Sequence, residues 1–274
     1  VGYNAGGTLS TGSNNTFIGG LAGDATDDGA NNVAVGKSAL SANCGDSNTA
    51  IGSGSLTLTT GASNTAVGKD AGGGVTTGTG NLTLGSSSGN LTVVLQTGTN
   101  NTIVGTGART AATDTLSSVV LGYNITGGGN NTARIGTSTG GTVTIDLDGS
   151  DTSWAAASDS RLKKDVADST VGLAFIKDLR PVTFKWNAKN AITNTLPQYD
   201  EDSSDPVYGK GKAHHGFIAQ EVKTVIDAHS DVVDGHNLWV EDPDGTQLVA
   251  PSALVPMLVK AIQELEARIA TLEG

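Results

Sequence analysis

One short motif recurs along the first half of the sequence and limits what this part of the chain can fold into. Each copy holds polar residues, two or three small or apolar residues and a closing glycine, as in Asn31–Gly36. A unit of this size cannot bury enough apolar surface to fold alone, but stacked units share one continuous core. The closing glycines are Gly2, Gly19, Gly36, Gly52, Gly68, Gly85, Gly105, Gly122 and Gly136.

The repeat predicts a parallel β-solenoid or β-roll over residues 1–142. Short apolar strands such as Phe17-Ile18 and Ile103-Val104 would stack, with glycine at tight corners and Asn and Thr in hydrogen-bond ladders. A disordered Gly/Ser-rich segment is the alternative, and the regular Ile/Val spacing argues against it. Because the pattern opens in mid-unit at Val1, we expect the sequence to be a piece of a longer protein.

The composition changes near residues 150–158. The first 157 residues hold four of the 16 basic and nine of the 27 acidic residues. We therefore predict a repeat shaft over residues 1–142, a junction strand and linker over 143–157 and a globular domain over 158–274. The net charge of −11 argues against a nucleic-acid partner, because phosphate binding needs a basic face. No apolar run approaches the roughly 20 residues that span a membrane.

The shaft sequence shows no sign of a catalytic, cofactor or metal site. The single Cys44 excludes an intrachain disulfide and most metal clusters, and we interpret it as a small residue in a turn. Sugar-cleaving enzymes need two carboxylates at a set separation, whereas the aspartates between Asp24 and Asp114 fall mostly in expected turns. Aromatic residues for sugar stacking are few. They are Tyr3, Phe17, Tyr123 and Trp154.

A serine and a lysine lie close together where the globular domain begins, in the segment Ser158–Lys163. A lysine takes a hydroxyl proton near neutral pH when partial burial lowers its pKa. The spacing is common, however, and the same segment is typical of a helix N-cap. Lys164 is a second candidate base. From the residue types alone, the capping interpretation is favoured.

Four ordered motifs nevertheless resemble the intramolecular chaperone domain of endosialidase-type tailspikes, which is also found on other phage fibres. The resemblance covers residues 158–274. The shaft repeats are similar to the head repeats of trimeric autotransporter adhesins and to repeats in phage fibres. The chaperone motifs are Ser158–Lys163, Gly172–Trp186, His215–Val222 and Leu254–Leu265.

The chaperone resemblance implies a single-turnover self-cleaving serine peptidase with Ser158 as nucleophile and Lys163 as general base. It places the break at the Ser158–Asp159 bond. Attack on the Ala157 carbonyl would form an easier five-membered ring, so chemistry alone leaves the bond open. Further residues match the motifs in supporting roles. They are Asp159, Arg161, His215, Gln220 and Glu221.

The histidines suggest a metal site, but no third ligand has a suitable spacing. We expect His215 to pack or to form a hydrogen bond in the domain core, and we predict no metal and no cofactor. The remaining elements are predicted as a helix that is capped by Ser169 or Thr170 and runs to Arg180, a strand over 182–186, a polar loop over 187–212, a helix beginning at Gln220 and short strands near 238–240 and 247–249.

The last helix, over residues 254–273, carries apolar residues spaced alternately three and four apart. This heptad pattern predicts a coiled coil, and its Ile/Leu mixture allows a trimer. An amphipathic helix packed on its own domain is the alternative. The heptad residues are Val255, Leu258, Ile262, Leu265, Ile269 and Leu272.

Together these features predict a β-solenoid shaft followed by a small α+β chaperone domain that ends in a trimeric coiled-coil helix. We expect a homotrimeric phage tail fibre or spike, assembled in the host cytoplasm, that binds a glycan receptor on the host surface without membrane insertion. The chaperone part would template the shaft and be released by cleavage at Ser158. In the alternative, an uncleaved trimeric adhesin keeps this domain as a permanent cap. A polysaccharide-degrading shaft is disfavoured.

Overall fold

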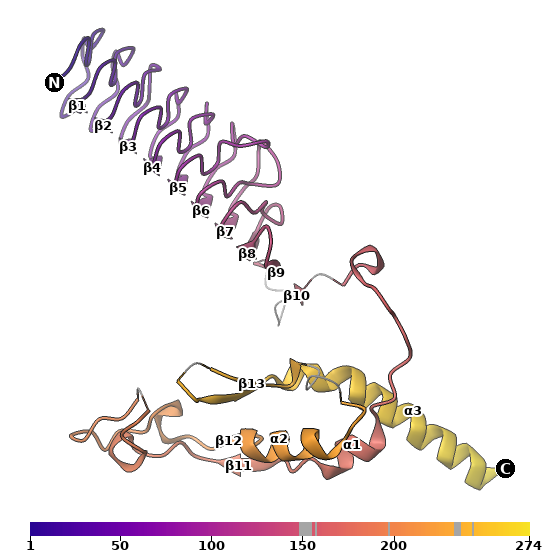
Figure 1. The fold of residues 1–274 in the computed structure, drawn as a ribbon. Helices are drawn as coiled ribbons and strands as arrows, with labels where there is room; N and C mark the ends of the chain where they lie inside the picture. Colours follow the sequence, from indigo (N-terminus) through magenta and orange to yellow (C-terminus); the bar gives the residue numbers. More distant parts are fainter. Residues whose placement is uncertain (148–154, 157, 197, 233–236, 243) are drawn as a thin grey trace. The chain divides into compact units, whose positions relative to one another are not determined.

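The computed structural model describes residues 1–147, 155–156, 158–196, 198–232, 237–242 and 244–274 (Figure 1). The chain forms two compact units, Val1–Lys163 and Lys164–Gly274. Two residues named above, Trp154 and Ala157, lie outside the described residues, and so does His236, one of the four histidines. None of the described helices is both long enough and apolar enough to cross a bilayer.

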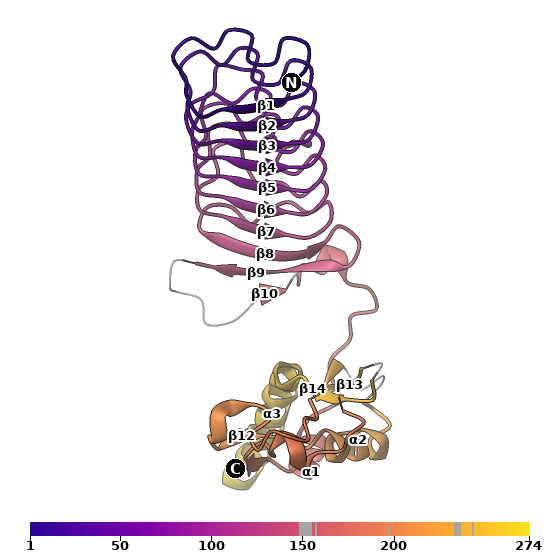
Figure 2. The same ribbon diagram turned by 90° about the vertical axis from the view of Figure 1, so that its left-hand side faces the viewer.

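The first unit contains the parallel β-solenoid that the repeats predict (Figure 2). Each repeat contributes one strand, and successive strands pair in parallel so that equivalent residues such as Ala34, Ala50 and Ala66 are register partners. The chain therefore coils upon itself, one strand per turn. The strands are β1 (Thr16–Ile18), β2 (Val33–Val35), β3 (Thr49–Ile51), β4 (Thr65–Val67), β5 (Leu82–Leu84), β6 (Thr102–Val104), β7 (Val119–Leu121) and β8 (Thr132–Thr137).

The glycine that closes each repeat is required by two separate constraints. Its φ lies between +122° and +152° in every copy, a region that side chains rarely adopt. A Cβ atom on Gly52 would also lie 2.3 Å from the carbonyl oxygen of Gly68 in the next turn. Since neighbouring strands are about 4.8 Å apart, the corner of each turn leaves no room for a side chain.

A column of buried asparagines runs through the solenoid. The Oδ1 atom of Asn48 accepts the backbone N–H of Asn64 at 2.9 Å, and the Nδ2 atom of Asn48 donates to the carbonyl of Gly61 at 3.0 Å. A buried amide without partners is costly, so each turn depends on its neighbour. The expected asparagine ladder is thus confirmed. It runs through Asn15, Asn32, Asn48, Asn64, Asn81 and Asn101 to the backbone N–H of Ser118.

Small aliphatic side chains fill the solenoid interior, among them Ala34, Leu40 and Ile103. Cys44 lies in the segment between β2 and β3, at a position with no assigned turn, and its side chain is buried in this core. Its sulfur lies 3.3 Å from the hydroxyl of Thr26, and burial raises the pKa of the Cys44 thiol. The thiol is therefore a packing group of the shaft.

An antiparallel hairpin ends the stack of parallel turns. Strand β8 pairs with β9 (Gly141–Asp146), and β9 pairs in turn with β10 (Ala155–Ala156), the last strand of a ten-stranded sheet. Below the last apolar turn, the Nε atom of Arg134 donates to the hydroxyl of Thr144 at 2.8 Å. The guanidinium also donates to the carbonyl of Thr126 at 3.0 Å. Arg134 thus closes the core with satisfied polar groups.

The second unit is a small α+β domain, as predicted. Its core joins side chains from all three helices, including Phe175, Val222 and Met257. Strands β11 and β12 form one antiparallel pair, and β13 and β14 form another. The elements are α1 (Leu173–Asp178), β11 (Val182–Phe184), η2 (Lys189–Ala191), η3 (Gly209–Gly211), β12 (His214–Gly216), α2 (Ala219–Ala228), β13 (Trp239–Glu241), β14 (Gln247–Val249), η5 (Pro251–Ala253) and α3 (Leu254–Glu273).

Helix α1 differs from the sequence prediction at both ends. It begins at Leu173 with Gly172 at its N-cap, instead of following a cap at Ser169 or Thr170, and it ends at Asp178, before Arg180. Its first N–H is satisfied by the carboxylate of Glu264 on α3, which accepts from Leu173 N at 2.9 Å. The prediction of a local cap was wrong because the capping group comes from a distant part of the chain.

Candidate functional site

The candidate site begins directly after the last strand of the shaft sheet. Strand β10 ends at Ala156, and Ser158 follows two residues later. Because β10 is held by β9, the segment that carries Ser158 is anchored to the end of the solenoid. Ser158 and Lys163 both belong to the first compact unit.

A tight turn brings the serine and the lysine together. The 3-10 turn η1 (Ser160–Leu162) reverses the chain between them. Its N-cap is Asp159, whose carboxylate accepts the backbone N–H of Arg161 at 2.9 Å. The Nζ atom of Lys163 then lies 2.8 Å from the Oγ atom of Ser158, within hydrogen-bond distance. The segment is therefore both a cap, as the residue types favour, and a serine–lysine pair.

Asp159 and Arg161 form a clasp over this turn. The guanidinium donates through Nε to Oδ1 at 3.0 Å and through Nη2 to Oδ2 at 2.6 Å. Together with the backbone hydrogen bond, these contacts hold the pKa of the Asp159 carboxyl below its usual value; the Arg161 side chain is the main cause. The clasp gives Asp159 and Arg161 a positioning role, because it fixes the turn that presents Lys163 to Ser158.

The pair has the geometry for proton transfer but is open to solvent. Both Ser158 and Lys163 are exposed. A neutral lysine amine 2.8 Å from a hydroxyl accepts its proton directly, but lysine is neutral near pH 7 only where burial disfavours its charge. Lys164, the rival base, lies 3.7 Å from the carboxylate of Asp165 instead. Of the two lysines, Lys163 is the one in contact with Ser158.

The supporting residues of the second unit are not gathered into one site. His215 is exposed on β12, so the expectation that it packs in the core was wrong. The strand alternation turns its neighbour His214 inward, with the His214 ring 5.7 Å from that of Phe184. Glu221 forms a 2.5 Å ion pair with Arg180. This contact lowers the pKa of the Glu221 carboxyl, and it links α2 to the segment after α1.

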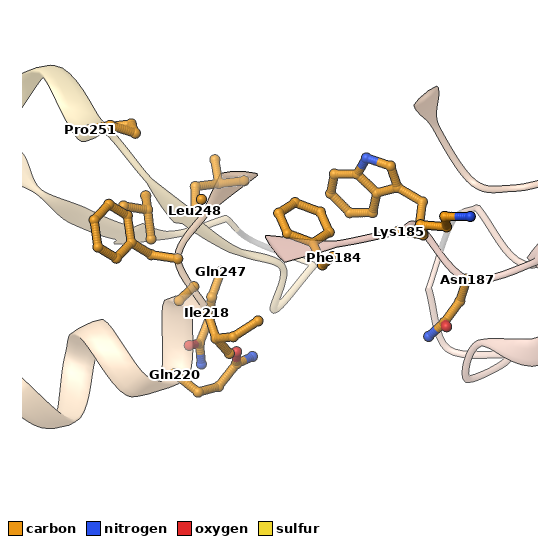
Figure 3. Close-up of a pocket in the computed structure, with 13 residues that line it drawn as sticks. Phe184, Lys185, Asn187, Ile218, Gln220, Gln247, Leu248 and Pro251 are labelled. Atoms are coloured by element: carbon orange, nitrogen blue, oxygen red, sulfur yellow. The ribbon is translucent and has the colours of Figure 1, made fainter. Parts of the chain in front are cut away.

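An aromatic-lined groove of about 560 Å³ lies between β11, the start of α2 and β14 (Figure 3). Gln220 lines it beside Phe184, Trp186 and Leu248. Lys185 is the one ionisable residue in its lining, so the groove lacks a partner group for acid–base chemistry. Sequence reasoning missed it because its walls come from three separate segments of the chain.

Helix α3 uses two different faces. Leu254, Met257 and Ala261 are buried against the domain, and Glu264 on the same side caps α1. The predicted heptad residues point elsewhere and are all exposed, for example Ile262 at 64% and Ile269 at 53%. The packing of α3 on its own domain therefore leaves the heptad face exposed. The exposed heptad residues are Val255, Leu258, Ile262, Leu265, Ile269 and Leu272.

The shaft offers no second cluster of chemical groups among the described residues. Its aspartates act in turns, as when Asp46 accepts the backbone N–H of Ala30 at 2.8 Å. Of the aromatic residues, Tyr3 and Tyr123 are exposed, whereas Phe17 packs against the core. No group of three His, Cys, Asp or Glu side chains is placed to hold a metal ion in the part of the chain that the structure describes.

One comparison with known proteins gives a match. Residues 158–231 match the model of a peptidase family described as chaperone of endosialidase. The match begins at Ser158 and includes the first three motifs; the shaft and α3 lie outside it. No curated protein and no solved structure matches the chain. The match supports a chaperone-type, peptidase-related domain after the solenoid.

Proposed function

We propose that residues 158–274 are an intramolecular chaperone that trimerises, assists folding of the β-solenoid and is then released by cleavage at Ser158. The observation that carries this proposal is the 2.8 Å contact between Lys163 Nζ and Ser158 Oγ. This contact lies where the family match begins and two residues after the last strand of the shaft sheet. A separable chaperone would be expected to carry its cleavage chemistry at this boundary.

The shaft supplies the reason for a chaperone. The parallel strand pairings from β1 to β8 join residues in different repeats, and the repeats are alike enough to pair out of register. Such non-local, repetitive contacts fold slowly. Three chains held together at their C-terminal helices would nucleate the shaft next to β9 and β10. The free heptad face of α3 supports this role, because a coiled coil needs an apolar seam that its own domain does not cover.

The cleavage step consumes one water. Lys163 takes the hydroxyl proton as Ser158 Oγ bonds to a carbonyl carbon, the C–N bond breaks, and the proton passes to the departing amine. Water then hydrolyses the ester. Attack on the Ala157 carbonyl releases the amine of Ser158, whereas attack on the Ser158 carbonyl releases that of Asp159. We propose that assembly covers the exposed lysine, so that the step proceeds only after the chains have associated.

Once the chaperone domain has been released, a shaft that unfolds lacks the assembly nucleus that it needs to refold. The folded shaft is then maintained by its slow rate of unfolding. In the wider protein, the shaft would be part of a phage tail fibre or spike whose glycan receptor lies on the host surface. The resemblance of the repeats to fibre and adhesin repeats supports this. Exposed Tyr3 and Tyr123 are the described shaft aromatics available for sugar stacking.

The test is the mass of the purified full chain and of matched variants. The native chain should give two fragments that meet at residue 157–158 or 158–159, and Ser158→Ala should give one uncut, assembled chain. Lys163→Ala should slow cleavage by about 100-fold or more, as loss of a general base does. Ser160→Ala and Lys164→Ala are the controls and should still be cut. Cleavage of Ser158→Ala at the same bond would refute the mechanism.

The exposure of Ser158 and Lys163 favours one alternative, an uncleaved trimeric adhesin in which the domain is a permanent cap. The same masses separate the two proposals. A native chain that stays intact after assembly, and that matches Ser158→Ala in mass apart from the substitution, supports the cap.

A further inference from the structure

The outward face of the solenoid sheet carries an unusual column of side chains. In each short strand the middle residue points into the core, and the third residue points outward. A solvent-facing position on such a strand is normally polar. Here the third residue of each three-residue strand, β1 to β7, is Ile, Val or Leu, and the register aligns Ile135 of β8 and Val143 of β9 with this column. We call this column the aliphatic stripe, and it consists of Ile18, Val35, Ile51, Val67, Leu84, Val104, Leu121, Ile135 and Val143.

The register makes the stripe continuous. Each member is the direct strand partner of the next, from Ile18 beside Val35 to Ile135 beside Val143. Nine neighbouring positions span about 38 Å at the usual strand spacing of about 4.8 Å. Several members remain well exposed, including Ile18 at 47% and Leu84 at 42%. The stripe is thus a long apolar surface that the described residues of its own unit leave partly exposed.

The neighbouring outward column is also uncharged. The first strand positions are mainly Thr and Val, as at Thr49, Thr65 and Thr102. Arg134, the one charged residue at a central strand position, bonds inside the solenoid. The outward sheet face of β1–β7 therefore presents no charge to a partner. An apolar, uncharged face of this length favours a stable interface over a solvent-exposed surface.

We propose that the aliphatic stripe is the surface through which a second copy of this chain packs along the shaft. The regular spacing of the stripe residues favours a second copy of this chain as the partner. Another copy presents the same side chains at the same spacing of about 4.8 Å, so two stripes stay in register over their whole length. A globular partner without that repeat would match only a few turns. The free heptad face of α3 on the same chain points to the same kind of partner.

The inference deepens the proposed function, since it names the contact that keeps the shafts together once α3 has been released. It rests on the proposed function only in that α3 first brings the copies together. In a parallel arrangement about a common axis, identical stripe residues face one another. A cysteine on the stripe should therefore lie within disulfide reach of its counterpart in another copy.

The experiment compares two cysteine variants of the full chain. Ile51→Cys lies on the stripe, and Leu58→Cys is a matched control at an exposed leucine outside it. Mild oxidation and a non-reducing denaturing gel should show cross-linked pairs for most Ile51→Cys chains and for few Leu58→Cys chains. Adding Leu84→Asp to Ile51→Cys should abolish the cross-link, whereas adding Leu91→Asp, a change at an exposed loop leucine, should preserve it.

Light scattering on the same samples separates the two proposals. A multimer whose Ile51→Cys variant cross-links no better than Leu58→Cys would overturn the stripe as an interface and leave assembly through α3 intact. A monomer at every concentration would overturn both. Cross-linking that persists with Leu84→Asp would also count against the stripe, because a buried aspartate in an apolar interface is costly.

Discussion

At the scale of single residues, the junction depends on local chemistry within six positions. Asp159 caps the turn and binds Arg161, and this clasp places Lys163 against Ser158. The sequence identified these residues by type and by family motif. The structure adds how they are connected, because a 3-10 turn and not a regular helix closes the distance. The roles of Asp159 and Arg161 follow from that geometry.

The clasp has a defined pH dependence. Hydrogen bonds from Arg161 lower the folded-state pKa of Asp159 below its ordinary value of 3.8. The interaction is therefore complete above that value and is lost as the pH falls through the lower folded-state pKa. We expect Arg161→Gln to raise the titration midpoint of the Asp159 carboxyl, measured by carbon NMR.

Arg180→Gln is the matched control for this titration, since Arg180 binds Glu221 instead. It should raise the midpoint of Glu221 and leave that of Asp159 unchanged. An Asp159 midpoint that is the same in the native chain and in Arg161→Gln would contradict the clasp.

At the scale of elements, each turn of the solenoid is held by contacts with the next turn. The asparagine ladder joins turns by backbone and side-chain hydrogen bonds, and the glycine corner permits their close approach. Helix α3 is the opposite case, because one of its faces packs on its own domain and the other is exposed. Met257 packs in its own domain while Ile262 is exposed, although both lie on one heptad-patterned helix.

The glycine corner predicts a stability effect. Gly52→Ala would combine a φ of +135° with a Cβ atom 2.3 Å from the Gly68 carbonyl oxygen. We expect it to lower the free energy of unfolding of the shaft by about 2 kcal/mol or more, measured by denaturant titration followed by circular dichroism.

Gly20→Ala is the control for this substitution. A Cβ atom there meets nothing closer than 4.0 Å, and Gly20 does not have a positive φ. We expect a change within about 1 kcal/mol in either direction. Equal effects at Gly20 and Gly52 would show that the corner is less constrained than its geometry indicates.

At the scale of the whole molecule, each compact unit presents an apolar surface that the described residues of that unit leave exposed. In the shaft it is the aliphatic stripe, and in the chaperone-type domain it is the heptad face of α3. Both are repetitive along their element, with periods set by the strand spacing and by the heptad. A chain with two such surfaces fits an assembly of identical copies better than a monomer.

Assembly and cleavage should therefore depend on the same helix. Ile262→Asp places a charge on the heptad face, and we expect it to convert the chain to a monomer in light scattering and to prevent cleavage at Ser158. Gln263→Asp, at an exposed neighbouring position outside the heptad residues, should remain assembled and be cut. A monomeric Ile262→Asp chain that is still cut would show that cleavage needs no assembly.

The sequence by itself determined the shaft, because each repeat carries its own complete set of constraints. A glycine corner and a short strand recur in each repeat, and a ladder asparagine precedes each strand from β1 to β6, so the fold could be predicted from local patterns. It also predicted the heptad face of α3, whereas Ser158 and Lys163 were singled out by the family motif and not by their residue types. In each of these cases the decisive groups are close in the chain.

Only the tertiary structure decided which groups meet across long separations and which surfaces stay uncovered. Glu264 caps α1 from 91 residues away, so no local pattern near Leu173 could reveal it. The inward turn of His214 instead of His215 depends on the pairing of β12 with β11. The apolar residues of the aliphatic stripe can be read from the sequence, but their exposure depends on the face of the sheet to which each side chain points. Whether a side chain is buried depends on how the whole chain packs, and it cannot be predicted from the residue type alone.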